Sequence, residues 1–260
     1  MSTLNVSNLK NPSASSPGLV LNADGTCSQL GFRNALINGN PIINQRGYAS
    51  GTATSGANQY TLDRWRVVTS GQSITFSDSA NVRTVTAPAG GIEQVIEGLN
   101  ILSGTYVLNW TGTATATVDG ASVVKGGTVT LTGGTNATVR FIGGTFSLAQ
   151  LEPGTVATPF ERRSYGQELA LCERYYQKLL AGVTVPSTTN TGNYTFTTPF
   201  RAVPRTSSTS LVSYANTSYV NASSLTCVAA GTYGVESQWI SSVNGFAGVH
   251  YTDIIINAEF

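Results

Sequence analysis

The stretch "SYGQELALCERYYQKLL", residues 164–180, carries the one convincing helix signal in the chain. Ser164 can cap the N-terminus of a helix, and Gln167, three residues later, completes a capping box. Gly182 can end the helix in a left-handed turn. Because the chain on both sides has the pattern of strands and turns, we expect one helix linking two β domains. The predicted apolar face of this helix consists of Leu169, Cys172, Tyr176 and Leu179.

The residues around this helix resemble a known family. The segment "VATPFERRSYGQELALCERYYQKL", residues 156–179, is similar to the segment that follows a jelly-roll module in many bacteriophage tail-fibre and virion-appendage proteins. The family pattern is roughly "ATPFExRxYGxELALCQRYYxK". The same family fits "NALINGNPIINQRG" at residues 34–47, "YTLDRWRV" at residues 60–67 and "PFRAVPR" at residues 199–205. The resemblance implies a structural protein of a phage virion, containing a jelly-roll-like sandwich.

The chain has few charges for its length. Only 10% of its 260 residues are charged and the net charge is +1, whereas about a quarter of the residues are charged in an ordinary soluble domain. This balance indicates neither a nucleic-acid partner nor an anionic membrane. Because so few charges protect poorly against self-association, we expect partner chains to cover much of the surface. With the family as support, we predict a homotrimer.

Cysteine usage and the N-terminal residues exclude several classes of protein. Cys27, Cys172 and Cys227 are far apart and show neither a disulfide framework nor zinc-ligand spacing. With a single histidine as well, we expect no metal. The Gly-Gly pairs lack the context of a nucleotide-binding loop, so we expect no cofactor. Residues 1–10 lack a basic start followed by an apolar run, and no stretch approaches the ~20 apolar residues of a membrane span. We expect synthesis in a cytoplasm without a cleaved signal and no membrane insertion. The resemblance implies a final location in the virion.

The sequence divides into four parts: an N-terminal segment (residues 1–30), a jelly-roll-like β-sandwich (31–153), a linker with the helix (154–182) and a smaller β domain (183–260). The N-terminal segment holds short strand-like runs that cannot bury a core alone. An extended segment can add itself to the sheet edge of another protein. We therefore expect this segment to dock the chain onto another virion protein, tail or capsid. Its apolar residues are Leu4, Val6, Leu9, Leu19, Val20 and Leu21.

Both β domains are predicted from short strands separated by turn signals. In residues 31–153, strand patterns such as 92–96 and 137–142 alternate with turn pairs such as Asp119-Gly120. This spacing is typical of a sandwich or jelly roll. In the C-terminal domain the longest strand pattern, residues 249–257, contains three consecutive isoleucines, Ile254 to Ile256. A continuous apolar strand predicts burial on both faces, in the centre of a sheet or inside a trimer.

The sequence offers no convincing catalytic constellation. His250 is the single histidine, so no Ser-His-Asp or Cys-His triad can be assembled convincingly. No two carboxylates stand out as the acid pair that a glycan-cleaving enzyme needs. We therefore predict no catalytic residues. Glu161, Arg162 and Arg163 are expected to make ion pairs that fix the domain junction.

Sugar binding is the remaining candidate chemistry. A sugar ring offers an apolar C–H face surrounded by hydroxyl groups, which suits aromatic side chains with polar neighbours. The stretch "YANTSYVN", residues 214–221, has that composition and is predicted to be a polar loop. Its candidate glycan contacts are Tyr214, Asn216, Tyr219 and Asn221. The three tryptophans, Trp65, Trp110 and Trp239, are predicted to be core residues, with ligand binding as the alternative.

These observations favour a non-enzymatic virion structural protein that forms a short surface fibre or appendage. It is expected to be anchored by its N-terminus and to bind host glycans. One alternative is a capsid-decorating head-fibre protein with a mainly mechanical role. A weaker alternative is a glycan-cleaving tailspike. Both a tail and a head location stay open.

Overall fold

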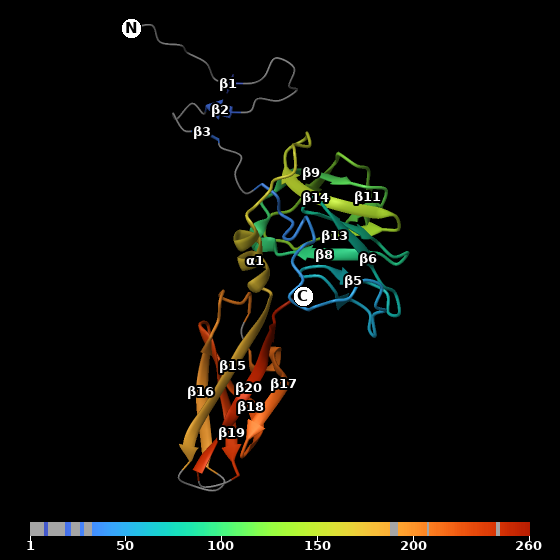
Figure 1. The fold of residues 1–260 in the computed structure, drawn as a ribbon. Coiled ribbons are helices and arrows are strands. Elements are labelled where there is room, and N and C mark those ends of the chain that lie inside the picture. The colour runs from blue at the N-terminus through green and yellow to red at the C-terminus, as the bar shows by residue number, and fades with distance from the viewer. Residues whose placement is uncertain are drawn as a thin grey trace, which may run out of the picture.

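The structure, a computed structural model, describes three short strands near the N-terminus and then residues 33–187, 192–206, 208–242 and 245–260; the side chains of residues 1–32, 184–187, 245 and 251 are outside the description. Within this part of the chain, two antiparallel β-sandwiches follow one another, with helix α1 (Tyr165–Glu173) between them in sequence. Figure 1 shows the sandwiches end to end, with α1 near the place where they meet. The predicted mainly β fold with one linking α-helix is confirmed for these residues.

The first sandwich consists of two antiparallel sheets. One contains β4 (Gln59–Tyr60), β5 (Arg66–Val67), β8 (Ile92–Ile96), β10 (Thr115–Val118), β11 (Ala121–Val123) and β13 (Ala137–Ile142). Its strand order is β11-β10-β13-β8-β5-β4. The other contains β6 (Thr75–Ser79), β7 (Val82–Thr86), β9 (Gly104–Thr111), β12 (Gly127–Leu131) and β14 (Thr145–Pro153). Its order is β12-β9-β14-β7-β6, and the 3-10 helix η1 (Gly98–Asn100) precedes β9.

Side-chain alternation explains which face of each strand is buried. In β13, Ala137, Val139 and Phe141 are buried, whereas Thr138 and Arg140 lie on the outer face and stay partly exposed. This is the period of two that an extended strand imposes. The predictions of strands at residues 92–96 and 137–142 are confirmed, with the same bounds.

Aromatic rings fill the centre of the first sandwich. The ring centroids of Trp65 and Phe146 lie 5.1 Å apart, and those of Phe141 and Phe146 lie 4.4 Å apart in a stacked arrangement. Trp110 packs at 5.4 Å from Phe141. Trp239 is fully buried in the second sandwich. The prediction that the three tryptophans are core residues is confirmed.

The helix is shorter than the sequence predicts. Ser164 and Gln167 form the predicted capping box, but α1 ends at Glu173, where the amide of Tyr175 donates to the carbonyl of Cys172. Tyr176 and Leu179 lie on β15 (Tyr176–Ser187), so the prediction of one helical face through them is wrong. The twelve-residue strand pairs along its length with β20 (Gly245–Asn257), and this tertiary pairing overrides a weak local helix preference.

Gly182 does not end the helix either. It lies within β15, at a shift in the register between β15 and β20. A Cβ atom at this position would collide with the carbonyl oxygen of His250. The glycine therefore serves a close approach of two strands. As a consequence, the second sandwich begins at Tyr176 rather than at residue 183.

The second sandwich consists of two three-stranded sheets. The first contains β15, β20 and β17 (Val212–Val220), in the order β15-β20-β17. The second contains β16 (Asn193–Pro199), β18 (Ala222–Ala230) and β19 (Gly234–Ser241), in the order β16-β19-β18. The short helix η2 (Thr209–Leu211) precedes β17. The predicted polar loop at residues 214–221 is instead mostly strand β17, because it pairs with β20.

Strand β20 is the central strand of its sheet. The sequence predicts that this strand lies either in the centre of a sheet or inside a trimer, and the first of these is observed. Ile254 and Ile256 are buried, whereas Ile255 is half-buried. The two-sided burial predicted from the three isoleucines therefore holds in part.

The three N-terminal strands form an antiparallel meander of their own. β1 (Asn8–Leu9), β2 (Leu19–Leu21) and β3 (Cys27–Ser28) pair in the order β1-β2-β3. Leu9 is opposite Leu19, and Leu21 is opposite Cys27. The predicted docking residues Leu4 and Val6 are outside the described residues, as are the side chains of Leu9, Leu19, Val20 and Leu21.

Candidate functional site

A polar groove lies on the outer face of the six-stranded sheet, with a volume of about 540 Å³. Strands β5, β8, β10 and β13 form its floor, and the turn between β10 and β11 forms one side. Small-molecule sites in proteins have volumes of about 300–1,000 Å³, so this groove is the candidate functional site. Its lining residues are Arg66, Glu93, Thr117, Asp119, Gly120, Thr138, Arg140 and Ile142.

Glu93 holds the two arginines of the groove in place. It lies opposite Arg66 on β5 and opposite Arg140 on β13, and its side chain is only 3% exposed. Its Oε1 accepts from Arg66 Nε at 2.9 Å and from Nη2 at 2.7 Å, and its Oε2 accepts from Arg140 Nε at 2.7 Å. Since a buried carboxylate is tolerated when it is paired and hydrogen-bonded, these bonds fix both guanidinium groups on the groove floor.

Asp119 forms the side of the groove through a tight turn. Asp119 and Gly120 are the two central residues of the hairpin turn between β10 and β11, and their φ angles are 50° and 83°. Two positive φ angles are typical of the turn type whose backbone twist matches the twist of the flanking strands. The Oδ1 atom of Asp119 accepts from the backbone amide of Thr138 at 2.7 Å. Its Oδ2 atom makes no hydrogen bond with another described residue. The turn therefore leaves one carboxylate oxygen available on the groove.

The groove combines free donors with free acceptors. Among the described residues, the hydroxyl groups of Thr117 and Thr138 have no hydrogen-bond partner. Glu93 has both oxygens engaged by guanidinium groups and serves as an anchor. The predicted alternative of a glycan-cleaving enzyme needs two carboxyl groups that act as acid and base, and Asp119 is the only other carboxylate among the groove's lining residues. The arrangement suits recognition by hydrogen bonds.

A second polar cluster joins the two sandwiches beside the groove. Arg64 is 1% exposed, and its guanidinium group donates to the Glu259 carboxylate and lies 3.5 Å from the ring centroid of Tyr175. Arg46 approaches Glu259 at 3.4 Å. The groove residue Arg66 also takes part, because its Nη1 donates to the Phe260 carbonyl oxygen at 3.1 Å. Residues 259 and 260 thus return from β20 to the first sandwich.

Further polar contacts surround this junction. Glu97 of the first sandwich accepts from Arg174 at 3.0 Å and from the Tyr175 hydroxyl at 3.0 Å. The side chain of Gln45 donates to the Tyr176 carbonyl oxygen at 2.9 Å. Arg205 donates from Nε to the Ala258 carbonyl oxygen at 2.9 Å. The contacts come from both sides of the boundary, so the two sandwiches are fixed to each other.

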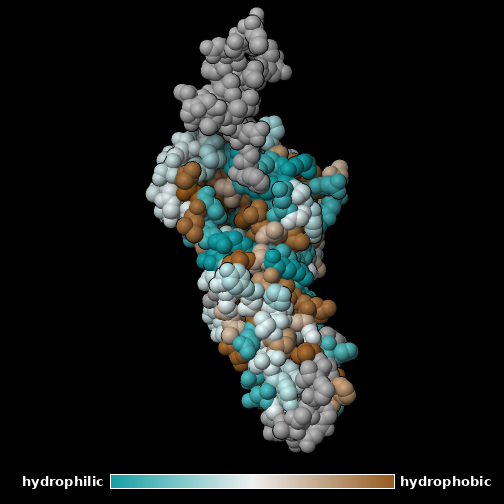
Figure 2. All heavy atoms as spheres, turned by 90° about the vertical axis from the view of Figure 1, so that its left-hand side faces the viewer, coloured by the Kyte–Doolittle hydropathy of each residue, from teal (hydrophilic) through white to brown (hydrophobic). Residues whose placement is uncertain are grey.

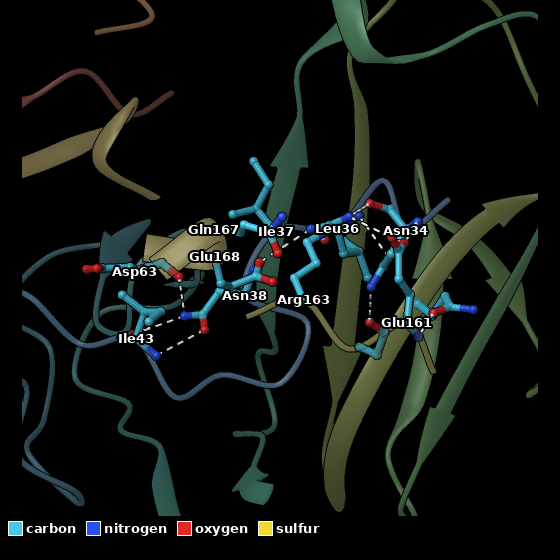
Figure 3. Close-up of polar contacts among 12 residues, drawn as sticks. Asn34, Leu36, Ile37, Asn38, Ile43, Asp63, Glu161, Arg163, Gln167 and Glu168 are labelled. Atoms are coloured by element: carbon cyan, nitrogen blue, oxygen red, sulfur yellow. Dashed lines mark hydrogen bonds and ion pairs between the residues drawn. The ribbon is translucent and has the colours of Figure 1, made fainter. Parts of the chain in front are cut away.

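Glu161 and Arg163 fasten the helix segment to the first sandwich, as Figure 3 shows. The Glu161 carboxylate accepts from the Asn34 amide at 2.7 Å. Arg163 lies 3.7 Å from Glu161 and 3.4 Å from Glu168. Glu168 in turn accepts from the Asn38 amide. The predicted ion pairs therefore exist for Glu161 and Arg163 but not, among the described residues, for Arg162. They tie the segment before and at the start of α1 to residues 34–38 of the first sandwich rather than the two β domains to each other.

All four predicted glycan contacts make hydrogen bonds within the second sandwich, and two of them are Tyr214 and Asn216. The Tyr214 hydroxyl is 2.7 Å from the Ser237 hydroxyl, and burial raises the pKa of Tyr214 to about 12. Tyr214 also packs against the apolar core of its sandwich. Asn216, with φ 49°, donates to Asp253 at 2.7 Å.

The other two, Tyr219 and Asn221, lie near the turn between β17 and β18. Tyr219 is 41% exposed, and its hydroxyl accepts from the Leu225 amide at 3.1 Å. Asn221, with φ 47°, donates to the Phe246 carbonyl oxygen at 3.0 Å. The structure thus places Tyr219 near the surface and Tyr214, partly buried, against the core, so the two rings do not form one exposed platform. Their role in glycan binding stays a prediction.

Comparisons with known proteins give no relative for this chain. No family model, no curated protein and no solved structure matches it. None of the helices in the described residues has the length and apolar character of a membrane span. In the same residues, no three His, Cys, Asp or Glu side chains are grouped so that they could hold a metal ion.

Proposed function

We propose that this chain is a non-enzymatic structural protein of a bacteriophage virion. It forms a short fibre or appendage on the particle surface, attached by its N-terminal segment and contacting host glycans through its outer parts. The first sandwich is proposed to be a jelly roll, as in the fibre proteins that the segment at residues 156–179 resembles. A tail and a head location both agree with this proposal.

The observation that carries the proposal is the fixed, end-to-end arrangement of the two sandwiches. Figures 1 and 2 show an elongated body. The buried pair of Arg64 with Glu259, and the contacts of Glu97 with Arg174 and Tyr175, lie where its two halves meet. An appendage that must project from a particle needs such a stiff junction, whereas an ordinary interdomain linker permits relative motion. The engaged oxygens of Glu93 agree with a role in binding rather than in hydrolysis.

Exposed apolar side chains support the proposed homotrimer. Leu99, Leu102, Val124 and Leu180 are large and strongly exposed on the single chain. Figure 2 shows apolar residues, in brown, at several places on the visible face of both sandwiches. Exposed apolar surface is covered in many assemblies, and a chain with few charges has little protection against association.

The test of the anchoring role is deletion of residues 1–30. Strands β1 to β3 form their own meander, so the truncated protein should keep both sandwiches folded. Its circular dichroism spectrum should retain the β-sheet signal that residues 33–260 contribute to the spectrum of the full chain. Phage particles assembled with the truncated chain should lack the protein. Incorporation into particles at the normal copy number would show that the anchor lies elsewhere.

A further inference from the structure

We propose that the groove on the outer face of the six-stranded sheet binds an uncharged, hydroxyl-rich sugar residue. Arg140, Asp119, Thr117 and Thr138 would contact its hydroxyl groups. This inference rests on the glycan contact in the proposed function and gives that contact a place and a ligand class. It moves the expected sugar contact from the second sandwich to the first.

The donors available to a ligand come mainly from Arg140. Arg66 uses Nε and Nη2 on Glu93 and Nη1 on the Phe260 carbonyl oxygen. Arg140 uses Nε and Nη2 on Glu93, and its Nη1 makes no hydrogen bond with another described residue. Its side chain is 37% exposed. Arg140 can therefore donate to a ligand while Glu93 holds its orientation.

The acceptors lie beside Arg140, on β13, on the neighbouring strand β10 and in the turn that follows β10. Asp119 is held by the Thr138 amide through Oδ1, which leaves Oδ2 to accept from a ligand hydroxyl. The Thr117 and Thr138 hydroxyls can donate or accept. Both threonines stand on neighbouring strands, since Thr117 is opposite Arg140 in the pairing of β10 with β13. The four side chains thus face one small area of the sheet.

The mixture of charges selects the ligand class. Arg66 and Arg140 balance Glu93 and Asp119, so the groove carries two positive and two negative groups. A phosphate, sulfate or carboxylate would approach Asp119 unfavourably, and a cation would approach the two guanidinium groups unfavourably. A sugar hydroxyl both donates and accepts, so it satisfies Arg140 and Asp119 together. The side chain of Ile142 lines the groove and can pack against the C–H face of the ring.

The test uses the full chain and ligand-observed NMR by saturation transfer. The neutral probes are D-glucose, D-galactose, D-mannose, L-rhamnose and N-acetyl-D-glucosamine, and the charged probe is D-glucuronate, with inorganic sulfate as a competitor. We expect at least one neutral sugar to bind, and sulfate not to displace it. Asp119→Asn keeps an oxygen for the Thr138 amide and replaces the free acceptor by an amide donor. We expect this variant to weaken the affinity about tenfold or more.

A second variant and a control complete the test. Arg140→Gln should also weaken binding. Because this variant removes the donors to Oε2 of Glu93, its thermal stability should be measured to separate a loss of binding from a loss of folding. Arg83→Gln removes an arginine paired with the exposed Asp78 outside the groove, and it should bind as the wild type does. The inference is overturned if no neutral sugar binds, if Asp119→Asn binds unchanged, or if glucuronate or sulfate binds preferentially. None of these results would touch the anchoring role, which deletion of residues 1–30 tests separately.

Discussion

Arg64 provides the sharpest test of the interdomain junction. Its guanidinium group is almost fully buried, paired with Glu259, hydrogen-bonded to the Val95 carbonyl oxygen and stacked on Tyr175. In Arg64→Met the Glu259 carboxylate, itself 3% exposed, would keep the backbone amide of residue 64 at 3.3 Å and the contact with Arg46 at 3.4 Å. Breaking one partner of a buried ion pair costs about 3–5 kcal/mol when the remaining charge is left without compensation. Because Glu259 keeps these two contacts, we expect a loss towards the lower end of that range in the free energy of unfolding.

The measurement is urea denaturation followed by circular dichroism, on a double-mutant cycle. Glu259→Met alone should also cost several kcal/mol, because it leaves Arg64 charged and buried. The double variant removes both charges, so it should lose less than the sum of the single losses, with a coupling of about 1–3 kcal/mol. The control, Lys178→Met, breaks a pair with Asp253 in which the lysine side chain is 42% exposed and should cost about 1 kcal/mol or less.

Two results would refute this account of the junction. A loss below about 1 kcal/mol for Arg64→Met would mean that the pair is hydrated or that the sandwiches move apart. Strictly additive losses in the cycle would mean that Arg64 and Glu259 do not interact. Either result would also remove the main support for a stiff appendage.

Further predictions concern pH, packing and assembly. Burial raises the pKa of Asp63 in the folded protein above its usual value of 3.8. Protonation of Asp63 therefore stabilises the folded state, and this contribution is fully present below the pKa of an aspartate in the unfolded chain, about 3.9. This contribution is lost as the pH rises through the raised pKa of the folded state, so the stability of the wild type relative to Asp63→Asn should fall as the pH rises above about 4; a pH-independent difference would contradict this. Leu169→Asp should cost several kcal/mol, because Leu169 packs against the cluster of Ile37, Ile43, Cys172 and Tyr175; an unchanged melting temperature would show an exposed face. Light scattering of the full chain at micromolar concentration should give the mass of a trimer, and a stable monomer would rule the trimer out.

The sequence predicted those elements whose signal is local. The strands at residues 92–96 and 137–142 were predictable because apolar residues alternate, or run together, between glycine turns. The cap at Ser164 was predictable because a capping box spans only four residues. The end of the helix was not, because Tyr176 and Leu179 fit a helical spacing and a strand equally well. Pairing with β20, about 80 residues away in sequence, decides between them.

The groove was hidden for a related reason. Arg66, Glu93 and Arg140 are separated by 27 and 47 residues, and only the register of β5, β8 and β13 brings them together. No short sequence motif contains these three residues. The alternation of residues 137–142 does predict that Arg140 faces outward, but its pairing with Glu93 follows only from the order of the strands in the sheet. The loop predicted at residues 214–221 failed in the same way, because pairing with β20 makes it a strand.

The segment "YTLDRWRV" shows how one short stretch serves core, junction and groove at once. Trp65 points into the core and donates from Nε1 to the Asn38 carbonyl oxygen at 2.9 Å, so its neighbour Arg66 must face outward to the groove. Arg64 lies in the turn before β5, and its φ of 71° directs it toward the junction, where it meets Glu259. Arg66 contacts both Glu93 in the groove and Phe260 at the junction. The position of the groove's arginine is therefore coupled to the contact between the sandwiches, and loosening the junction should also disturb the groove.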